Sequence, residues 1–208
     1  MAHRDTSGRA LTDYPRPSVA VDTAVLTAAP GEALCVLLIE EGGRPRLPGT
    51  FLHQGETLAD AVHRSLTEKA GLPALLPEQL HVFDRLGRDD RGWVLSVAHL
   101  ATIRWVDAAA MGLRLVPVRD VPPMPYDHGD IVARAVAELR RGYALQPDPS
   151  GLLAEPFTLR DLQRLHESVA GQNLMRDAFR RRMEPQLVAT GGLARGSVGK
   201  PAREFRKA

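Results

Sequence analysis

Residues 47–72 carry side chains that could bind a metal ion or a phosphate. Three and four positions separate Ser65 from Glu68 and Lys69. If this stretch is helical, the three side chains share one face, because residues at these separations are neighbours on a helix. That face would present one carboxylate beside a hydroxyl and an ammonium. Since Mg²⁺ prefers several oxygen ligands in octahedral geometry, the pattern favours an anion over a divalent cation.

The same stretch resembles the Nudix box, a loop–helix–loop that holds Mg²⁺ against a nucleoside diphosphate. The motif is a Gly, five residues, a Glu, seven residues, and then Arg-Glu-apolar-x-Glu-Glu-x-Gly-apolar. Three departures replace motif residues by Thr50, Ser65 and Lys69. The chain keeps the motif residues Glu56, Arg64, Leu66, Glu68, Gly71 and Leu72. The resemblance implies a pocket that still binds a diphosphate but lacks most of the carboxylates that metal-assisted hydrolysis requires.

We hypothesise that the ammonium of Lys69 takes the place of the metal against a pyrophosphate. On this hypothesis the site holds no metal, needs no cofactor and has no catalytic residue. The alternative is an active hydrolase of a nucleoside diphosphate derivative such as ADP-ribose, because Glu56 and Glu68 survive and could hold Mg²⁺ or Mn²⁺. The stretch could also be an ordinary amphipathic helix, since apolar residues recur at helical spacing at Leu58, Ala61, Val62 and Leu66.

The composition is that of a soluble globular protein. The chain has 208 residues, of which 44% are hydrophobic and 25% charged. No apolar run approaches the roughly 20 residues that span a bilayer, and the single Cys35 is expected to be a small buried hydrophobe. We therefore expect a cytoplasmic protein without a membrane partner. Residues 1–13 are polar and are expected to form a flexible N-terminus.

Charge divides the chain into two parts. Residues 1–150 hold 16 Lys/Arg and 19 Asp/Glu, whereas residues 151–208 hold 11 and 6. A basic module joined to a mildly acidic one suggests an anionic partner, and nucleic acid is the default candidate. Three prolines in residues 143–156 predict a linker, so the expected domains are 14–142 and 157–208.

The first domain reads as strands flanking two helices. Besides the box helix, a helix is predicted from about 127 to 141, with Gly142 as its C-terminal stop. The resulting fold class is α+β/α/β, an α/β/α sandwich with a mixed sheet, as the Nudix resemblance implies. Strand candidates occupy residues 19–26, 34–39, 80–86 and 93–103, with a further apolar segment at 113–118.

The second domain predicts a helix-turn-helix. Thr158 is the expected cap of a first helix that ends before Gly171, and Asn173 is the expected cap of a second helix over 174–183. The second helix divides into an apolar and a basic half. Arg182 falls in the apolar arc and is expected to reach around the helix end, whereas the basic half contains Arg176, Arg180 and Arg181.

A wing is predicted after the second helix. Residues 187–190 and 203–206 can pair as strands around a Gly-rich loop that contains Arg195 and Lys200, which suits a phosphate backbone. The full set of predicted DNA contacts is Thr158, Asn173, Arg176, Arg180, Arg181, Arg182, Arg195 and Lys200. The alternatives are a helical appendage whose arginines are simply solvated, and a helix-turn-helix that docks another protein.

A degenerate Nudix domain followed by a winged helix resembles the Nudix-related transcriptional regulators of NAD metabolism. Further similarities lie at 91–99, at 125–128 and at 157–162. The resemblance implies a homodimer on a palindromic DNA operator, acting as a repressor that ADP-ribose or a related nucleotide releases. The candidate ligand-binding residues are Glu56, Arg64, Glu68 and Lys69 near the pyrophosphate, with Arg85, Arg91 and Trp93 neutralising or stacking on the nucleotide.

Overall fold

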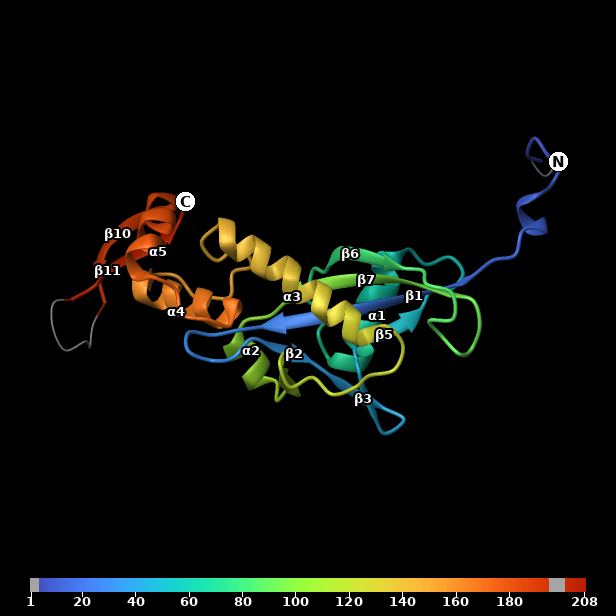
Figure 1. The fold of residues 1–208 in the computed structure, drawn as a ribbon, viewed down its shortest axis with the longest axis horizontal. Coiled ribbons are helices and arrows are strands. Elements are labelled where there is room, and N and C mark those ends of the chain that lie inside the picture. Colours follow the sequence, from blue (N-terminus) through green and yellow to red (C-terminus); the bar gives the residue numbers. More distant parts are fainter. Residues whose placement is uncertain (1–3, 195–200) are drawn as a thin grey trace.

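A six-stranded mixed sheet lies at the centre of the larger, N-terminal part of the chain (Figure 1). The computed structural model describes residues 4–194 and 201–208. The strand order is β6-β7-β1-β2-β8, with β5 paired to β1, and β1 runs parallel to β7 while the other pairs are antiparallel. A separate hairpin joins β3 (Ile39–Glu41) to β4 (Arg44–Arg46). The sheet strands are β1 (Ser18–Thr27), β2 (Cys35–Leu37), β5 (Gly49–Phe51), β6 (Glu78–Phe83), β7 (Val94–Thr102) and β8 (Leu115–Pro117).

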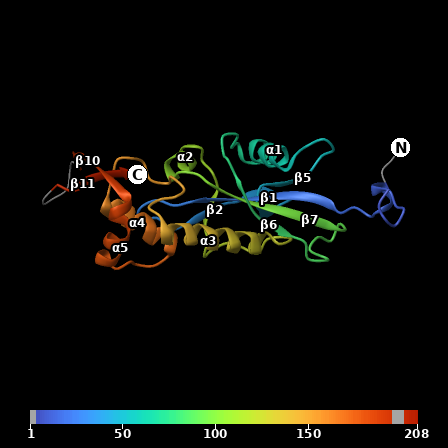
Figure 2. The same cartoon turned by 90° about the horizontal axis from the view of Figure 1, so that it is seen from above.

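Helices cover both faces of this sheet, which confirms the predicted α/β/α sandwich (Figure 2). Helices α1 (Leu58–Ala70) and α2 (Trp105–Ala110) lie on one face, and α3 (His128–Leu145) lies on the other. Strand β1 serves both layers because successive side chains of a strand point to opposite faces. Its Val21 and Val25 pack with α1, and its Leu26 packs with α3.

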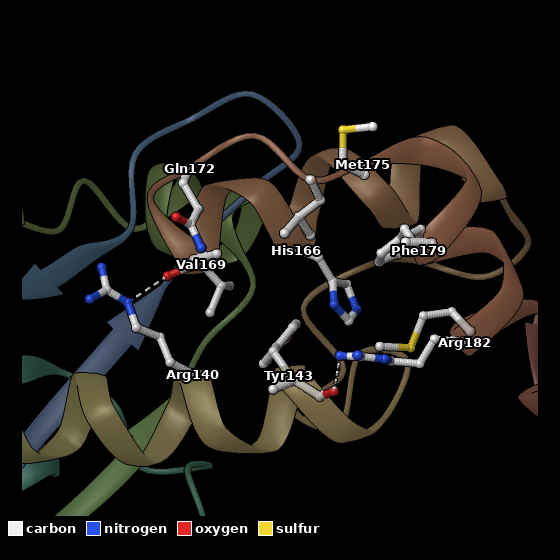
Figure 3. A pocket seen from close by; sticks show the side chains of 13 residues that line it. Arg140, Tyr143, His166, Val169, Gln172, Met175, Phe179 and Arg182 are labelled. Atoms are coloured by element: carbon white, nitrogen blue, oxygen red, sulfur yellow. Dashed lines mark hydrogen bonds between the residues drawn. The ribbon is translucent and has the colours of Figure 1, made fainter.

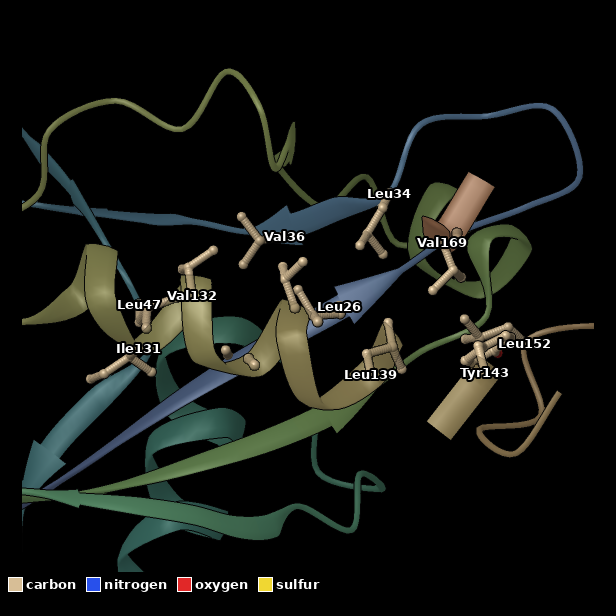
Figure 4. Close-up of a cluster of buried hydrophobic side chains, with 14 of the residues drawn as sticks. Leu26, Leu34, Val36, Leu47, Ile131, Val132, Leu139, Tyr143, Leu152 and Val169 are labelled. Atoms are coloured by element: carbon tan, nitrogen blue, oxygen red, sulfur yellow. The ribbon is translucent and has the colours of Figure 1, made fainter. Parts of the chain in front are cut away.

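The core under α3 continues into the C-terminal part of the chain (Figure 4). The predicted stop at Gly142 is wrong, because α3 continues to Leu145. Tyr143 is 3% exposed and packs in the same core as Val169, so burial of this last turn outweighs the low helix propensity of glycine. With 18 residues at about 1.5 Å each, α3 is roughly 27 Å long.

The predicted linker over 143–156 begins inside α3, and hydrogen bonds to one buried carboxylate fix its conformation. The buried carboxylate of Asp148 accepts hydrogen bonds from the Tyr143 hydroxyl at 2.6 Å and from the backbone N–H of Leu152 at 2.9 Å and of Leu153 at 3.0 Å. Leu152 also joins the core. The division into domains at this segment stays a prediction. The segment itself packs against both parts of the chain, because Leu153 contacts the main core and also the small C-terminal core.

The C-terminal part is a winged helix, as predicted. Its three-stranded sheet has the order β10-β11-β9. A small core of Phe157, Leu162, Phe179, Met183 and Phe205 holds the helices against the sheet. The predicted wing residues Arg195 and Lys200 lie outside the described residues. The elements are β9 (Phe157–Thr158), α4 (Leu159–Ala170), α5 (Arg176–Met183), a 3-10 turn (Glu184–Gln186), β10 (Leu187–Leu193) and β11 (Arg203–Lys207).

The second helix of this unit begins later than predicted. Helix α5 starts at Arg176, and Asn173 does not cap it. Side chains of α4 hold the preceding turn instead: the Gln163 amide donates to the Leu174 carbonyl at 3.0 Å, and the Leu174 N–H donates to Glu167 at 3.0 Å. These bonds fix the turn before α5, so Asn173 lies ahead of the cap position, which Met175 occupies.

The N-terminal segment projects away from the sheet (Figure 1). Its described part contains a bridge between Arg4 and Ala10 and a 3-10 turn over Leu11–Asp13. Whether the first 13 residues are flexible stays a prediction. None of the helices in the described ranges combines the length and apolarity needed to cross a bilayer.

Candidate ligand pocket and nucleic-acid interface

A cavity of about 210 Å³ opens between the β3–β4 hairpin, the start of α3 and the loop after β6. Four cationic side chains and three carboxylates border it. The cations come from three segments, namely β4, α1 and the loop after β6, so the tertiary fold brings them together. They are Arg46, Lys69, Arg88 and Arg91, and the carboxylates are those of Asp22, Glu41 and Asp89.

The carboxylates of this cavity are engaged by protein groups. Glu41 pairs with Arg46 at 2.8 Å and with Lys69 at 3.3 Å. Asp89 pairs with Arg91 at 2.7 Å, and the hydrogen bonds from Arg91 lower the pKa of Asp89. A divalent cation would have to displace these partners, so the donor set fits an anion better than Mg²⁺.

Asp22 is buried at the base of the cavity. It accepts a hydrogen bond from the Ser96 hydroxyl at 2.5 Å and lies 3.3 Å from the His128 Nε2. The Leu47 N–H donates to the His128 Nδ1 at 3.1 Å, which places the imidazole proton on Nε2, facing Asp22. Burial acts to raise the pKa of Asp22, but the hydrogen bonds from His128 and Ser96 and the charge of Arg88 lower it overall. Asp22 is therefore ionised.

Arg88 provides the strongest sign of an anionic ligand. Its side chain is 3% exposed, and its Nε donates to Asp127 at 2.6 Å. Its Nη2 lies 4.0 Å from Asp22 and has no hydrogen-bond acceptor among the described residues. The Nε of Arg46 is likewise buried without an acceptor in the described part of the chain. Because an unpaired buried donor is costly, both groups favour an anion in this cavity.

Arg91 lies between two aromatic rings at the mouth of the cavity. Its guanidinium is 4.9 Å from the Phe51 ring centre and 4.7 Å from that of Tyr126. Hydrogen bonds to Asp89 raise the pKa of Arg91. Stacking and ion pairing together give this predicted residue one fixed position. Trp93, predicted to stack on the nucleotide, is 51% exposed and lies outside the cavity lining.

Glu56 and Arg64 hold the box loop rather than line the cavity. The Arg64 Nε donates to Glu56 at 2.8 Å, and its two terminal nitrogens donate to the Thr50 hydroxyl at 3.1 Å and the Phe51 carbonyl at 3.0 Å. The hydrogen bonds from Arg64 lower the pKa of Glu56 to about 2. This clamp places Thr50 and Phe51 at the cavity wall, so Glu56 and Arg64 contribute to the pocket indirectly.

Helix α1 contains Ser65, Glu68 and Lys69 at the predicted helical spacing, but the three side chains differ in burial. Ser65 is 1% exposed, and its hydroxyl is buried without a partner among the described residues. Glu68 is exposed and lies outside the cavity lining, so of the three residues Lys69 alone faces the cavity. Arg85 also lies outside the lining and pairs with Asp127 at 2.9 Å. Within the described ranges no group of three or more His, Cys, Asp or Glu could hold a metal ion.

The winged helix carries a second candidate site, a groove of about 690 Å³ between α4, α5 and β11. Of the predicted DNA contacts, Thr158, Arg176 and Arg180 line it, and Arg181 is exposed on the same helix. Thr158 accepts a hydrogen bond from the Asp161 N–H at 3.2 Å and so caps α4 as predicted. Sequence reasoning missed the other arginines of this groove, Arg160, Arg164 and Arg203. The four-residue spacing of the first two could have revealed them.

Two predicted DNA contacts lie elsewhere. The Arg182 Nη1 donates to the Ala144 carbonyl at the end of α3 at 3.2 Å, and Arg182 lines a different cavity behind α5. Asn173 borders a third cavity, between the turn after β1 and α4. Neither residue lines the arginine groove.

Comparisons with known proteins agree with this two-site architecture. Residues 149–206 match the family model "NrtR DNA-binding winged helix domain". The chain is 31% identical to the ADPR-responsive transcriptional repressor NtrR of Acinetobacter baylyi, over 94% of this chain and 84% of that protein.

Solved structures give the same result. NrtR of Shewanella oneidensis complexed with a 27mer DNA superimposes with a TM-score of 0.75 at 30% identity, covering 91% of this chain and 93% of that one. The NUDIX domain of the same protein, complexed with ADP ribose, superimposes with a TM-score of 0.54 at 26% identity, covering 64% and 95%. The chain therefore belongs to the Nudix-related transcriptional regulators of the NrtR family.

Proposed function

We propose that this protein is a transcriptional repressor that binds DNA through its winged helix and senses ADP-ribose, or a related nucleotide, in its Nudix pocket. The genes it controls would belong to NAD metabolism. Relatives that are named for ADP-ribose and for DNA support the proposal at both sites. The observation that carries it is the buried Nη2 of Arg88, which has no acceptor in the part of the chain that the structure describes, in a cavity whose carboxylates are already paired.

The diphosphate of the effector would lie between Arg46, Lys69 and Arg88. Arg88 and Arg46 each offer an N–H that is unpaired within residues 4–194 and 201–208, and a guanidinium is well suited to phosphate oxygens. Lys69, held by Glu41 at 3.3 Å, would add a positive charge where a hydrolase would hold its metal. Binding would then need neither Mg²⁺ nor a cofactor.

DNA would bind the arginine groove of α4, α5 and β11. Its arginines are suited to phosphate contacts, and α5 is the helix that would enter the major groove. We further propose a homodimer on a palindromic operator, acting in the cytoplasm, because two recognition helices would then read two half-sites.

The direct test is to select bound fragments from genomic DNA and to measure affinity for them by fluorescence anisotropy with and without ADP-ribose. We expect ADP-ribose to weaken binding by roughly 5- to 150-fold, the usual range for coupled sites. An affinity that stays the same at saturating ADP-ribose would contradict the proposal.

Hydrolysis of ADP-ribose is the competing function, and a second measurement separates the two. The protein is incubated with ADP-ribose and Mg²⁺ or Mn²⁺, and AMP is measured. We expect no AMP, because Glu56 is bonded to Arg64 and Glu68 lies outside the cavity lining. We also expect EDTA to leave the affinity for ADP-ribose unchanged. Rapid release of AMP, or loss of binding in EDTA, would favour the hydrolase.

A further inference from the structure

Helix α3 begins in the effector pocket. Asp127, the residue before its first turn, accepts hydrogen bonds from Arg88 at 2.6 Å and from Arg85 at 2.9 Å. His128, its first residue, faces Asp22 at 3.3 Å. Hydrogen bonds from Arg85 and Arg88 offset the effect of burial and lower the pKa of Asp127, so the carboxylate is ionised. A diphosphate that occupies the free Nη2 of Arg88 would share this guanidinium with Asp127.

The same helix ends against the recognition helix α5. The last four carbonyls of an α-helix have no partner within it. Two of those in α3 accept hydrogen bonds from side chains in and just after α5. The Ala144 carbonyl accepts from the Arg182 Nη1 at 3.2 Å, and the Leu145 carbonyl accepts from the Gln186 side chain at 3.2 Å. A cation at this position is also favoured by the helix dipole.

The two helices of the winged helix are attached to the pocket domain in different ways. Helix α4 is anchored: Arg140 donates to the Val169 carbonyl at 2.9 Å, Ser168 donates to the Ala29 carbonyl at 2.9 Å, and Leu165 lies in the main core. A cavity of about 410 Å³ lies between α3, α4 and α5, and its lining includes Tyr143, His166 and Arg182 (Figure 3). Helix α5 packs on α4 through Phe179, whose ring centre lies 5.0 Å from that of His166, and its Arg182 bonds the end of α3 beside this cavity.

We infer that Arg182 is a positioning residue that links the effector pocket to the recognition helix through α3, and that it does not contact DNA. The inference rests on the proposed function. An effector at Arg88 acts on the start of a rigid helix roughly 27 Å long, at about 1.5 Å per residue. The hydrogen bond from Arg182 to Ala144 carries the displacement of the other end to α5, which changes how its exposed arginines meet the operator.

The test compares Arg182→Ala with Arg181→Ala in the full-length protein. For each, DNA affinity is measured with and without ADP-ribose, and ADP-ribose affinity with and without DNA. In Arg182→Ala we expect the effect of ADP-ribose on DNA binding to fall to less than a third of the wild-type factor. The reciprocal effect of DNA on ADP-ribose must fall by the same factor. The affinity for ADP-ribose alone stays within about twofold of wild type.

Arg181→Ala is the matched control on the same helix. It should weaken DNA binding and reduce the dependence of log affinity on log salt by about 0.9, the value for one lost phosphate contact. Its response to ADP-ribose should equal that of wild type. Arg182→Ala should leave the salt slope unchanged, and Gln186→Ala, which removes the second bond to α3, should reduce the response in part.

The outcomes separate the inference from the proposed function. If the DNA affinity of the wild type is the same with and without ADP-ribose, the proposed function is wrong, and there is no coupling between the two sites. If wild type responds and Arg182→Ala responds equally, the inference alone is overturned. It is also overturned if Arg182→Ala lowers the salt slope by about one unit, because Arg182 would then contact a phosphate.

Discussion

At the residue scale, the pocket depends on how charges are paired. Asp127 neutralises one edge of the Arg88 guanidinium and leaves another edge free. A buried donor without an acceptor costs about 1–3 kcal/mol, and an arriving phosphate oxygen would recover that energy. A site of this kind is preorganised, since the cation is already held in position when the ligand arrives.

Lys69→Glu tests the charge of the pocket without disturbing a buried residue. The substitution puts a second carboxylate beside Glu41, so we expect the affinity for ADP-ribose to fall at least tenfold, or about 1.4 kcal/mol, in calorimetric titration. Thr67→Glu, an exposed position on the same helix, adds the same charge away from the cavity and should bind normally. Equal losses in both variants would show that Lys69 has no special place in the site.

His166 should make stability depend on pH. Burial lowers its pKa from 6.5 to about 4, so between these values the unfolded chain binds a proton that the native chain does not. Unfolding is therefore favoured as pH falls from about 6.5 to 4, by about 3 kcal/mol in total at 1.36 kcal/mol per pKa unit.

Denaturant titrations at several pH values check this expectation. Between pH 6.5 and 4 the wild type should lose more unfolding free energy than His166→Gln, by most of this amount. The remaining titratable groups, such as the carboxylates, contribute equally to both proteins. Parallel pH profiles would rule out His166 as the source.

At the element scale, helices with different ends perform different tasks. Helix α4 has a complete capping box at Thr158 and a left-handed Gly171 at its end, so its limits are set locally. Helix α3 has no side-chain cap at its start, and its ends are bonded instead to Arg88 and Arg182. Contacts with the pocket at one end and with α5 at the other therefore fix the two ends of α3.

Gly142→Ala tests the continuation of α3 beyond residue 142. Because Gly142 lies inside the helix and its added Cβ would meet Pro149 at 3.4 Å, we expect a gain of about 0.5–1 kcal/mol in unfolding free energy. Gly171→Ala should do the opposite, since Gly171 has φ +73° and a Cβ there would lie 3.2 Å from Arg140. Thermal denaturation measures both, and a destabilised Gly142→Ala would place the helix end where the sequence predicted it.

Arg160→Ala tests whether α4 contributes to the DNA interface. Arg160 lines the arginine groove and is exposed, so its loss should weaken DNA binding for all sequences alike and lower the salt slope by about 0.9. Arg104→Ala removes an exposed arginine just before α2, outside this groove, and should leave the slope unchanged. An unaltered slope in Arg160→Ala would confine the interface to α5 and the wing.

At the scale of the whole molecule, one continuous core joins the two functional regions. Leu165 and Val169 of α4 pack with Leu26 and Leu139 of the larger domain, and Ser168 bonds the turn after β1. The net charges of −3 and +5 on the two regions direct an anionic polymer to the winged helix. Ligand and DNA therefore meet different surfaces of a single connected body.

The homodimer is the prediction that belongs to this scale. Two half-sites one helical turn apart require two recognition helices, so sedimentation should give twice the chain mass of 22.7 kDa. A monomer that still protects both halves of a palindromic site would contradict the proposed assembly.

The sequence by itself determined whatever depends on local spacing. Thr158 caps the helix that its capping box predicts, and the apolar residues at 19–26 predicted a strand where β1 lies. The Nudix skeleton and the wing strands were likewise legible, because caps, turns and periodic burial involve residues a few positions apart.

Only the tertiary structure decided which charged groups meet. Nothing in the sequence separates Arg88 from the other arginines, since its partner Asp127 lies 39 positions away. Nor could helical spacing show that Ser65 faces the core while Lys69 faces the cavity, or that Arg182 bonds the end of α3. Pairing and burial are set by contacts between distant segments, and these contacts exist only once the layers have packed.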